Sequence, residues 1–109
     1  MQQWLNELKS SNKLIIVEGK KDKDSLKKFG ITNIVTINKP IYELVEHIVN
    51  NYKEVIILTD LDKQGKKLYS TLKHNLQKSG VKIDSKFREF LYKNTRLSNI
   101  EGLSTYLKI

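Results

Sequence analysis

The sequence predicts an α/β fold, in which a mainly parallel sheet of about four strands carries helices on both of its faces. Two runs of aliphatic residues, 14–17 and 55–59, have the composition of strands that are buried on both sides, as in a parallel sheet. Segments with apolar residues at helical spacing alternate with these strands along the chain. Such alternation with short connections favours right-handed crossovers between parallel strands.

In the first part of the chain, turn residues separate the expected elements. Residues 3–9 carry apolar side chains at helical spacing and predict a short leading helix before the strand at 14–17. A helix over 22–29 should end at Gly30, because glycine favours the backbone conformation that closes helices. A second strand is expected over 33–37.

The second part of the chain begins with the clearest helical pattern. Pro40 suits the first turn of a helix, and apolar residues then recur every three or four positions over 41–49. The third strand, 55–59, is followed by a helix over 63–78. The remaining expected elements are a weak strand at 81–84, a short helix capped by Ser85, and a last helical turn or two within 100–107.

Composition limits the class of protein. The chain has 109 residues, the size of one domain, and its 20 basic and 12 acidic residues give a net charge of +8. This charge favours polyanionic partners such as RNA or DNA. No apolar run approaches the roughly 18 residues of a membrane-spanning helix, and the N-terminus lacks a signal-peptide layout. Without cysteine there is no disulfide framework and no thiolate zinc site, so we expect a cytoplasmic protein with no membrane partner.

Acidic residues follow the two most apolar strands. Glu18 comes after the first, and Asp60 and Asp62 come after the third. The carboxyl ends of parallel strands meet at one edge of a sheet, where α/β proteins place their ligand sites. Carboxylates gathered there repel unless protons or a metal ion neutralise them. The pattern predicts an Mg²⁺ site, with Mn²⁺ as an alternative ion, in which Glu18 is a third ligand or a general acid-base group.

Glycines and basic residues flank these acids. Gly19 and Gly65 would let the backbone turn sharply and approach a phosphate. The alternative for the glycines is that they are ordinary turn residues. The alternative for the carboxylates is that they only cap the helices that follow. Six lysines beside the two acidic loops are candidates for phosphate contacts: Lys20, Lys21, Lys23, Lys63, Lys66 and Lys67. Three more basic residues would extend this track: Lys39, Arg88 and Arg96. Glu101 is expected in a turn, with a return to the site as an additional acid as the alternative.

Segments 15–22 and 56–65 together resemble the Toprim domain, which is shared by topoisomerases, bacterial primases, ribonuclease M5 and OLD-type nucleases. The resemblance implies a Rossmann-like fold with a four-stranded parallel sheet. The resemblance covers about residues 13–80, and we expect a single domain, residues 1–109, with its core at about 13–84 and a helical extension at 85–109.

The resemblance also implies roles for the acidic residues. Glu18 would act as a general acid or base, and Asp60 and Asp62 would bind Mg²⁺. Asp22 matches the acid that follows the family's glutamate by four residues. The opening Glu-Gly-Lys-x-Asp is most similar to ribonuclease M5 and to small stand-alone archaeal Toprim proteins. Lys66 stands where topoisomerases and ribonuclease M5 have an acid, which removes an outer carboxylate.

Three functions are compatible with these features. The leading one is Mg²⁺-dependent phosphodiester chemistry, by a ribonuclease M5-like nuclease that acts on structured RNA rather than DNA. The alternative is a non-catalytic module that binds nucleic acid or a ribonucleoprotein, working with a protein partner or as a homodimer. A phosphoryl-accepting α/β domain of the receiver or haloacid-dehalogenase kind fits less well, because those domains place their paired acids after the first strand.

Overall fold

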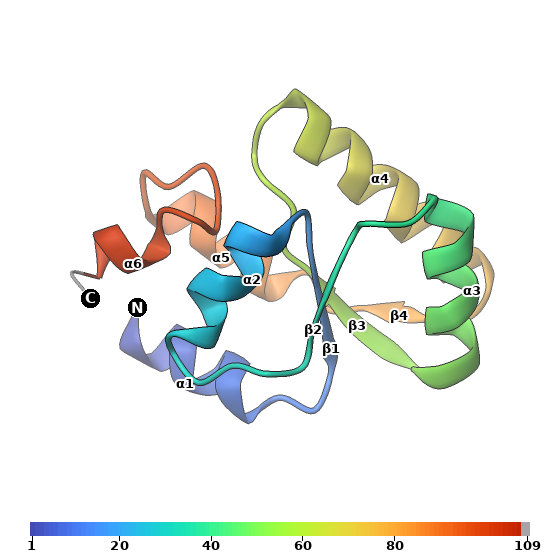
Figure 1. Ribbon diagram of the computed structural model, residues 1–109, viewed down its shortest axis with the longest axis horizontal. Helices are drawn as coiled ribbons and strands as arrows, with labels where there is room; N and C mark the ends of the chain where they lie inside the picture. The colour runs from blue at the N-terminus through green and yellow to red at the C-terminus, as the bar shows by residue number, and fades with distance from the viewer. Residues whose placement is uncertain (108–109) are drawn as a thin grey trace.

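The computed structural model describes residues 1–107, which form a four-stranded sheet between two groups of helices (Figure 1). The strand order is β2-β1-β3-β4, and all neighbouring strands are parallel. The strands are β1 (Leu14–Val17), β2 (Ile34–Thr36), β3 (Glu54–Ile57) and β4 (Lys82–Ile83). The helices are α1 (Gln2–Ser10), α2 (Lys20–Lys27), α3 (Ile41–Asn51), α4 (Lys63–Lys78), α5 (Lys86–Asn94) and α6 (Leu103–Tyr106). The predicted α/β fold is thereby confirmed.

The register of the two central strands determines where the acidic residues emerge. Ile16 of β1 pairs with Ile57 of β3, and the Leu58 N–H donates to the Ile16 carbonyl at 2.8 Å. The two strands run in the same direction and end almost level. The segments that follow them, which begin at Glu18 and Leu58, therefore leave the sheet at one edge.

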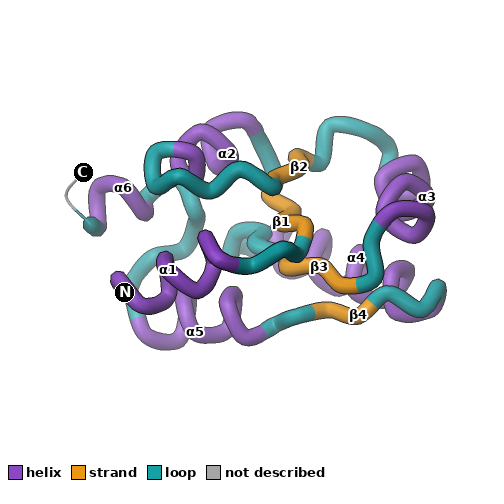
Figure 2. Tube along the Cα trace, turned by 90° about the horizontal axis from the view of Figure 1, so that it is seen from below, coloured by secondary structure: helices purple, strands orange, loops and turns teal. Residues whose placement is uncertain are grey.

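Alternate residues of β1 and β3 face the two groups of helices. On one face, Ile15 and Ile56 pack in a core with α1, α2, α5 and α6. On the other, Ile16 and Ile57 pack in a core with α3 and α4. Figure 2 shows the strands between these two groups. Every side chain of β1 is buried, and full burial of one such side chain stabilises the fold by about 1.5–3 kcal/mol.

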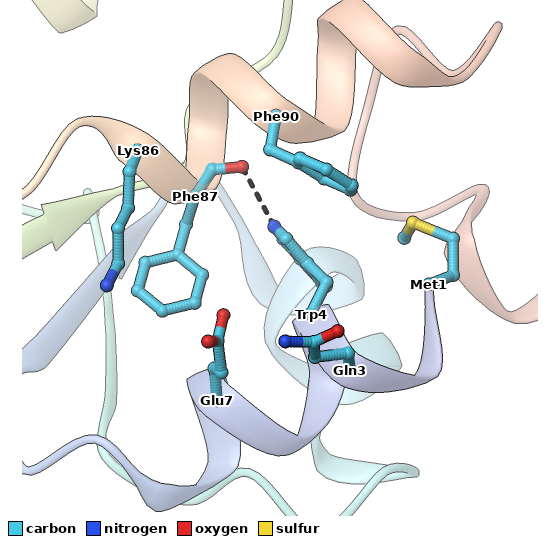
Figure 3. Close-up of a pocket in the computed structure, with 7 residues that line it drawn as sticks. All are labelled: Met1, Gln3, Trp4, Glu7, Lys86, Phe87 and Phe90. Carbon is cyan, nitrogen blue, oxygen red and sulfur yellow. Dashed lines mark hydrogen bonds between the residues drawn. The ribbon is translucent and has the colours of Figure 1, made fainter.

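Trp4 anchors the leading helix to α5. Its Nε1 donates to the Phe87 carbonyl at 3.0 Å, and the two rings form an edge-to-face pair with centroids 6.1 Å apart (Figure 3). Trp4 is only 4% exposed. The two residues also line an open hollow of about 280 Å³, beside which Phe90 remains exposed. The N-terminal helix is thus an integral part of the core.

Most predicted elements agree with the structure, and the differences have local causes. The predicted helix over 63–78 and strand over 14–17 have the observed bounds. Helix α2 begins at Lys20 instead of residue 22, because Gly19 and Asp22 form its capping interaction. Pro40 occupies the position before α3 and not its first turn. None of the helices described for residues 1–107 combines the length and the apolar character that a membrane crossing requires.

Candidate functional site

Glu18 and Asp60, which are 42 positions apart in the chain, are in direct contact at the carboxyl edge of the sheet. A Glu18 carboxylate oxygen, Oε2, accepts a hydrogen bond from the Asp60 backbone N–H at 2.6 Å. Both residues are half-buried. The contact joins the segment after β1 to the segment after β3, as expected from the parallel pairing of these strands.

The Asp60 carboxyl group lies in an unfavourable position for a negative charge. Burial raises its pKa to about 7, with smaller contributions from the charges of Glu18, Asp22 and Asp62. The backbone N–H of Ile100 favours the charged form and offsets a part of this rise. The Oδ1 atom is buried and has no hydrogen-bond partner among residues 1–107. A proton or a cation at this atom would relieve the repulsion.

Asp62 lies at the start of α4, where it serves as the helix cap. Its Oδ1 accepts from the Gly65 N–H at 2.7 Å, and the residue is exposed. Asp60 and Asp62 therefore differ in environment: one is half-buried in the loop, and the other faces solvent at a helix end. The capping role that the sequence left open for these carboxylates is real for Asp62, whose second oxygen remains available for another contact.

Asp22 is also a helix cap, but it is buried, with 7% of its surface exposed. Its Oδ2 accepts from the Gly19 N–H at 3.1 Å. Burial raises the pKa of Asp22, the Gly19 N–H opposes this rise, and the nearby charge of Glu101 adds to it. Asp22 thus orients the loop that carries Glu18 and adds negative charge next to Asp60.

Gly19 and Gly65 differ in whether the structure requires a glycine at their position. A Cβ atom on Gly65 would collide with the backbone carbonyl of Asp60, and the Thr59 hydroxyl donates to the Gly65 carbonyl at 2.8 Å. The first turn of α4 therefore packs directly against the acidic loop, and only glycine fits there. A Cβ atom on Gly19 would meet open space. Gly65 is thus required by a close approach to the protein's own loop, and the predicted approach to a phosphate stays a prediction.

Residues near the C-terminus close one side of the site. The Leu61 N–H donates to the Ser98 carbonyl at 2.8 Å, and the Ser25 hydroxyl donates to the Ile100 carbonyl at 3.2 Å. Ile100 is fully buried. Glu101 is exposed in the turn before α6, yet its charge is felt at Asp22. Glu101 thus lies in a turn, as expected, and near Asp22; its role as an additional acid stays a prediction.

Two side chains of α5 hold the acidic loop: Arg88, which the sequence placed on the phosphate track, and Tyr92, which it did not assign to the site. Arg88 donates to the carbonyls of Thr59 and Asp60, and the Tyr92 hydroxyl donates to the Thr59 carbonyl at 3.1 Å. Burial raises the pKa of Tyr92 well above its usual range, so its hydroxyl stays protonated. Arg88 was expected to extend the track of phosphate contacts. Arg88 and Tyr92 are four residues apart on one helix, and this spacing was the sequence feature that indicated a shared helix face.

The lysines proposed for phosphate contacts lie on the surface around the acidic edge. Five are exposed and Lys23 is half-buried; the exposed ones are Lys20, Lys21, Lys63, Lys66 and Lys67. The ion pairs found among residues 1–107 involve only Lys13, with Glu54 and Asp84. The lysines beside the acidic loops are thus not neutralised by acids of the described chain.

The donor set fits an open magnesium site better than a closed cage. In the part of the chain described, no three Asp, Glu, His or Cys side chains are grouped closely enough to enclose a metal ion. Mg²⁺ commonly uses one or two protein carboxylates and completes its coordination with water and substrate phosphate. The unpartnered Oδ1 of Asp60, with the charges of Glu18, Asp22 and Asp62 near enough to raise its pKa, provides one oxygen ligand of this type.

Known proteins resemble this chain in sequence and in fold. A UPF0292 protein of Methanocaldococcus jannaschii is 37% identical over 105 residues, which cover 92% of this chain and 82% of the relative. A UPF0292 protein of Pyrococcus abyssi is 34% identical over 110 residues, covering 96% and 83%. The solved structure of a putative protein from Aquifex aeolicus superposes with a TM-score of 0.87 at 35% identity, over 93% of this chain and 95% of that one. The Toprim domain model matches residues 13–94, which include β1 to α5, and the chain therefore belongs to the Toprim domain family.

Proposed function

We propose that this protein carries out Mg²⁺-dependent phosphodiester chemistry on structured nucleic acid, as a nuclease similar to ribonuclease M5 that prefers RNA to DNA. Membership of the Toprim family indicates a metal-dependent role related to nucleic acid. The observation that supports the proposal most strongly is the buried, unpartnered Oδ1 of Asp60 among other carboxylates. A carboxylate in such surroundings calls for a counter-charge.

The ion would be held by Asp60 and by the free oxygen of Asp62, and Glu18 would become a third ligand if its carboxylate moves toward the ion on binding, because the described residues do not group three acids closely. When bound, Mg²⁺, or Mn²⁺ in its place, supplies stabilisation of negative charge on the phosphate and leaving oxygens. The protein carboxylates would fill only some of the coordination positions of the ion. Water and a substrate phosphate would fill the others. Substrate binding and metal binding would then support each other.

Glu18 is suited to proton transfer. Its Oε2 is held by the Asp60 N–H at 2.6 Å, which fixes the orientation of the carboxylate. The other oxygen, Oε1, would take a proton from an attacking water or give one to the leaving oxygen. Accepting and donating this proton both need a carboxylate held near the scissile phosphate. The contact with Asp60 would hold the Glu18 carboxylate there.

The lysines around the edge would bind phosphates of the nucleic acid on either side of the scissile bond. Lys20 and Lys21 lie at the start of α2, and Lys63, Lys66 and Lys67 lie in the first turns of α4. Both groups flank the acidic loops and are exposed. Each phosphate contact displaces condensed counterions, so binding should weaken steeply with salt.

A non-catalytic binding module is the second candidate. Two features favour it: the described residues do not form a three-acid cage, and Lys66 occupies the position of an outer acid in related enzymes. A module of this kind would keep the lysine surface and would rely on a protein partner or a second copy for a firmer grip. It would bind nucleic acid without breaking a phosphodiester bond.

Cleavage assays separate the two candidates. The protein would be incubated with duplex RNA, single-stranded RNA and DNA, in Mg²⁺, Mn²⁺ or EDTA, beside the variants Glu18→Gln and Asp60→Asn. Glu46→Gln, at an exposed position of α3, is the matched control for loss of one acid. We expect metal-dependent cleavage of RNA that both site variants lose and the control keeps. Salt-sensitive binding without cleavage would favour the module. A protein that neither binds nor cleaves nucleic acid would contradict both candidates.

A further inference from the structure

Arg88 of α5 contacts the backbone of the acidic loop from the side of the core. Its Nε donates to the Thr59 carbonyl at 3.2 Å, and its Nη2 donates to the Asp60 carbonyl at 2.8 Å. The planar guanidinium presents its donors in a fixed fork, so one side chain reaches two successive carbonyls. The contact therefore restrains the Thr59–Asp60 peptide in position and in rotation.

Two tyrosine rings lie close to the guanidinium and restrict its position. Its Cζ atom lies 4.5 Å from the centroid of the Tyr69 ring, on α4, and 5.3 Å from that of Tyr92, on α5. Both distances are within the range of cation–π attraction. Because its rotamer is restricted before any loop contact forms, Arg88 loses less conformational freedom when it binds the two carbonyls.

The polar groups of the loop backbone are held from several directions at once. The Asp60 N–H donates to Glu18, and the Asp60 carbonyl accepts from Arg88. The next amide, that of Leu61, donates to the Ser98 carbonyl. Tyr92 adds a second donor to the Thr59 carbonyl. The peptide groups on both sides of the Asp60 Cα are thus restrained, and this determines where its carboxylate points.

The geometry argues against a direct role of Arg88 in phosphate binding. Arg88 is half-buried, two of its donors are used by loop carbonyls, and the centroids of two tyrosine rings lie 4.5 and 5.3 Å from its Cζ atom. Arg96, the other arginine of the chain, is exposed and makes no hydrogen bond or ion pair with the rest of the described residues. The two arginines carry the same charge in different settings, which makes them a matched pair.

We propose that Arg88 is a positioning residue of the acidic site: held beside Tyr69 and Tyr92, it fixes the Thr59–Asp60 backbone so that Asp60 and Glu18 keep the arrangement that binds the divalent ion. The effect on metal binding rests on the proposed function. The effect on the loop does not, because it follows from contacts within the protein. Residues that orient a metal-binding group typically change metal affinity about 10- to 100-fold when replaced.

The loop is tested first, in the absence of metal, by amide hydrogen exchange measured by NMR on the full chain. The variants are Arg88→Lys, Arg88→Gln and the control Arg96→Gln. Arg88→Lys keeps the charge but loses the fork, and Arg96→Gln loses the same charge elsewhere. We expect faster exchange at the amides of Asp60 and Leu61 in both Arg88 variants, by about tenfold or more, and no change in the control. The amide of Leu58, bonded to β1, reports whether the sheet itself stays intact.

Metal binding is tested second, by calorimetric titration of the same variants with Mn²⁺. We expect the affinity to fall about 10- to 100-fold in both Arg88 variants and to stay unchanged in Arg96→Gln. If Arg88→Gln is too unstable to study, Tyr92→Phe removes one of the loop donors and is expected to speed exchange at Asp60 to a smaller extent.

The outcomes separate this proposal from the proposed function. Loop amides that exchange equally in Arg88→Lys, Arg88→Gln and Arg96→Gln would overturn the positioning role. Unchanged exchange of the loop amides in Arg88→Lys would overturn it as well, because a positive charge without the guanidinium fork would then be enough to hold the loop. A wild-type protein that binds no Mn²⁺, with faster loop exchange in both Arg88 variants, would support the positioning role and overturn the metal-dependent function.

Discussion

The Glu18 carboxylate and the Asp60 backbone amide are joined by a hydrogen bond of 2.6 Å between the ends of β1 and β3. One acid of the site therefore holds the backbone of another. This contact exists because the two strands are adjacent and parallel and end nearly level. It leaves the Asp60 carboxyl group partly buried beside other negative charges, and most of the expected behaviour of the site follows from that position.

Replacement of Asp60 should change how stability depends on pH. The pKa of Asp60 is raised from an ordinary value of 3.8 to about 7 in the folded protein, so between these values the folded state binds more protons than the unfolded state. The free energy of unfolding should then decrease as pH rises from about 4 to about 7 because of this group. Asp60→Asn removes this contribution.

The measurement is thermal unfolding of both proteins from pH 4 to pH 8 without metal. The quantity compared is the melting temperature of Asp60→Asn minus that of the wild type. We expect this difference to increase as pH rises from 4 to 8, and we expect the variant to be the more stable protein at pH 8. Added Mg²⁺ should stabilise the wild type more at pH 8 than at pH 5. Equal dependence of the melting temperature on pH in the two proteins would show that the pKa of Asp60 is not raised in the folded state.

The two glycines of the site should differ in their tolerance of alanine. Gly65→Ala places a Cβ atom against the Asp60 carbonyl and should lower the free energy of unfolding by about 1–3 kcal/mol, as overpacking does. Gly19→Ala, where the added atom meets open space, should change it by less than about 0.5 kcal/mol. Urea unfolding measures both. Equal effects would mean that the first turn of α4 can move away from the loop at little cost.

The single tryptophan should contribute to stability through its hydrogen bond to α5. Trp4→Phe keeps a ring in the core but leaves the Phe87 carbonyl without this donor, which should lower the free energy of unfolding by about 1–3 kcal/mol. The control is Tyr42→Phe, at a residue with 70% of its surface exposed, which should have no measurable effect. Unfolding followed by circular dichroism makes the comparison, since Trp4→Phe removes the only indole fluorophore.

The lysines of α4 should contribute to nucleic-acid binding through charge. Replacing Lys66 and Lys67 by glutamine should weaken binding of duplex RNA and reduce the slope of log affinity against log salt by about 1 for each lost phosphate contact. Lys53→Gln, just before β3 at the opposite edge of the sheet, is the control and should leave the slope unchanged. The three proteins are compared by fluorescence anisotropy titrations at several salt concentrations. An unchanged slope in the α4 variant would place the nucleic acid on another surface.

The parts of this structure that could be predicted from sequence are those with a regular pattern. The helical spacing of leucines predicted 63–78 with its observed bounds, and the aliphatic run 14–17 predicted a buried strand. The proximity of Glu18 and Asp60 followed from one further assumption, that their strands are parallel and lie at one edge. Local pattern and topology were enough for these features.

Other features depend on contacts between distant segments, for which the sequence has no periodic signal. Nothing in the residues around Ser98 indicates that its carbonyl binds the amide of Leu61. A basic residue such as Arg88 reads as a surface charge until its partners are known, and those partners are backbone carbonyls, which every residue has. Gly65 was predicted to allow a close backbone approach, but the atom that requires it, the Asp60 carbonyl, is visible only in the folded chain.

The most direct test of the account is a calorimetric titration of the wild-type protein with Mn²⁺ and Mg²⁺ at pH 8, beside Asp60→Asn and the control Glu46→Gln. We predict saturable binding of a divalent ion to the wild type and to the control, and loss of that binding in Asp60→Asn, because Asp60 carries the buried oxygen without a partner among residues 1–107. Equal binding by wild type and Asp60→Asn would contradict the assignment of the metal site to the edge shared by Glu18 and Asp60.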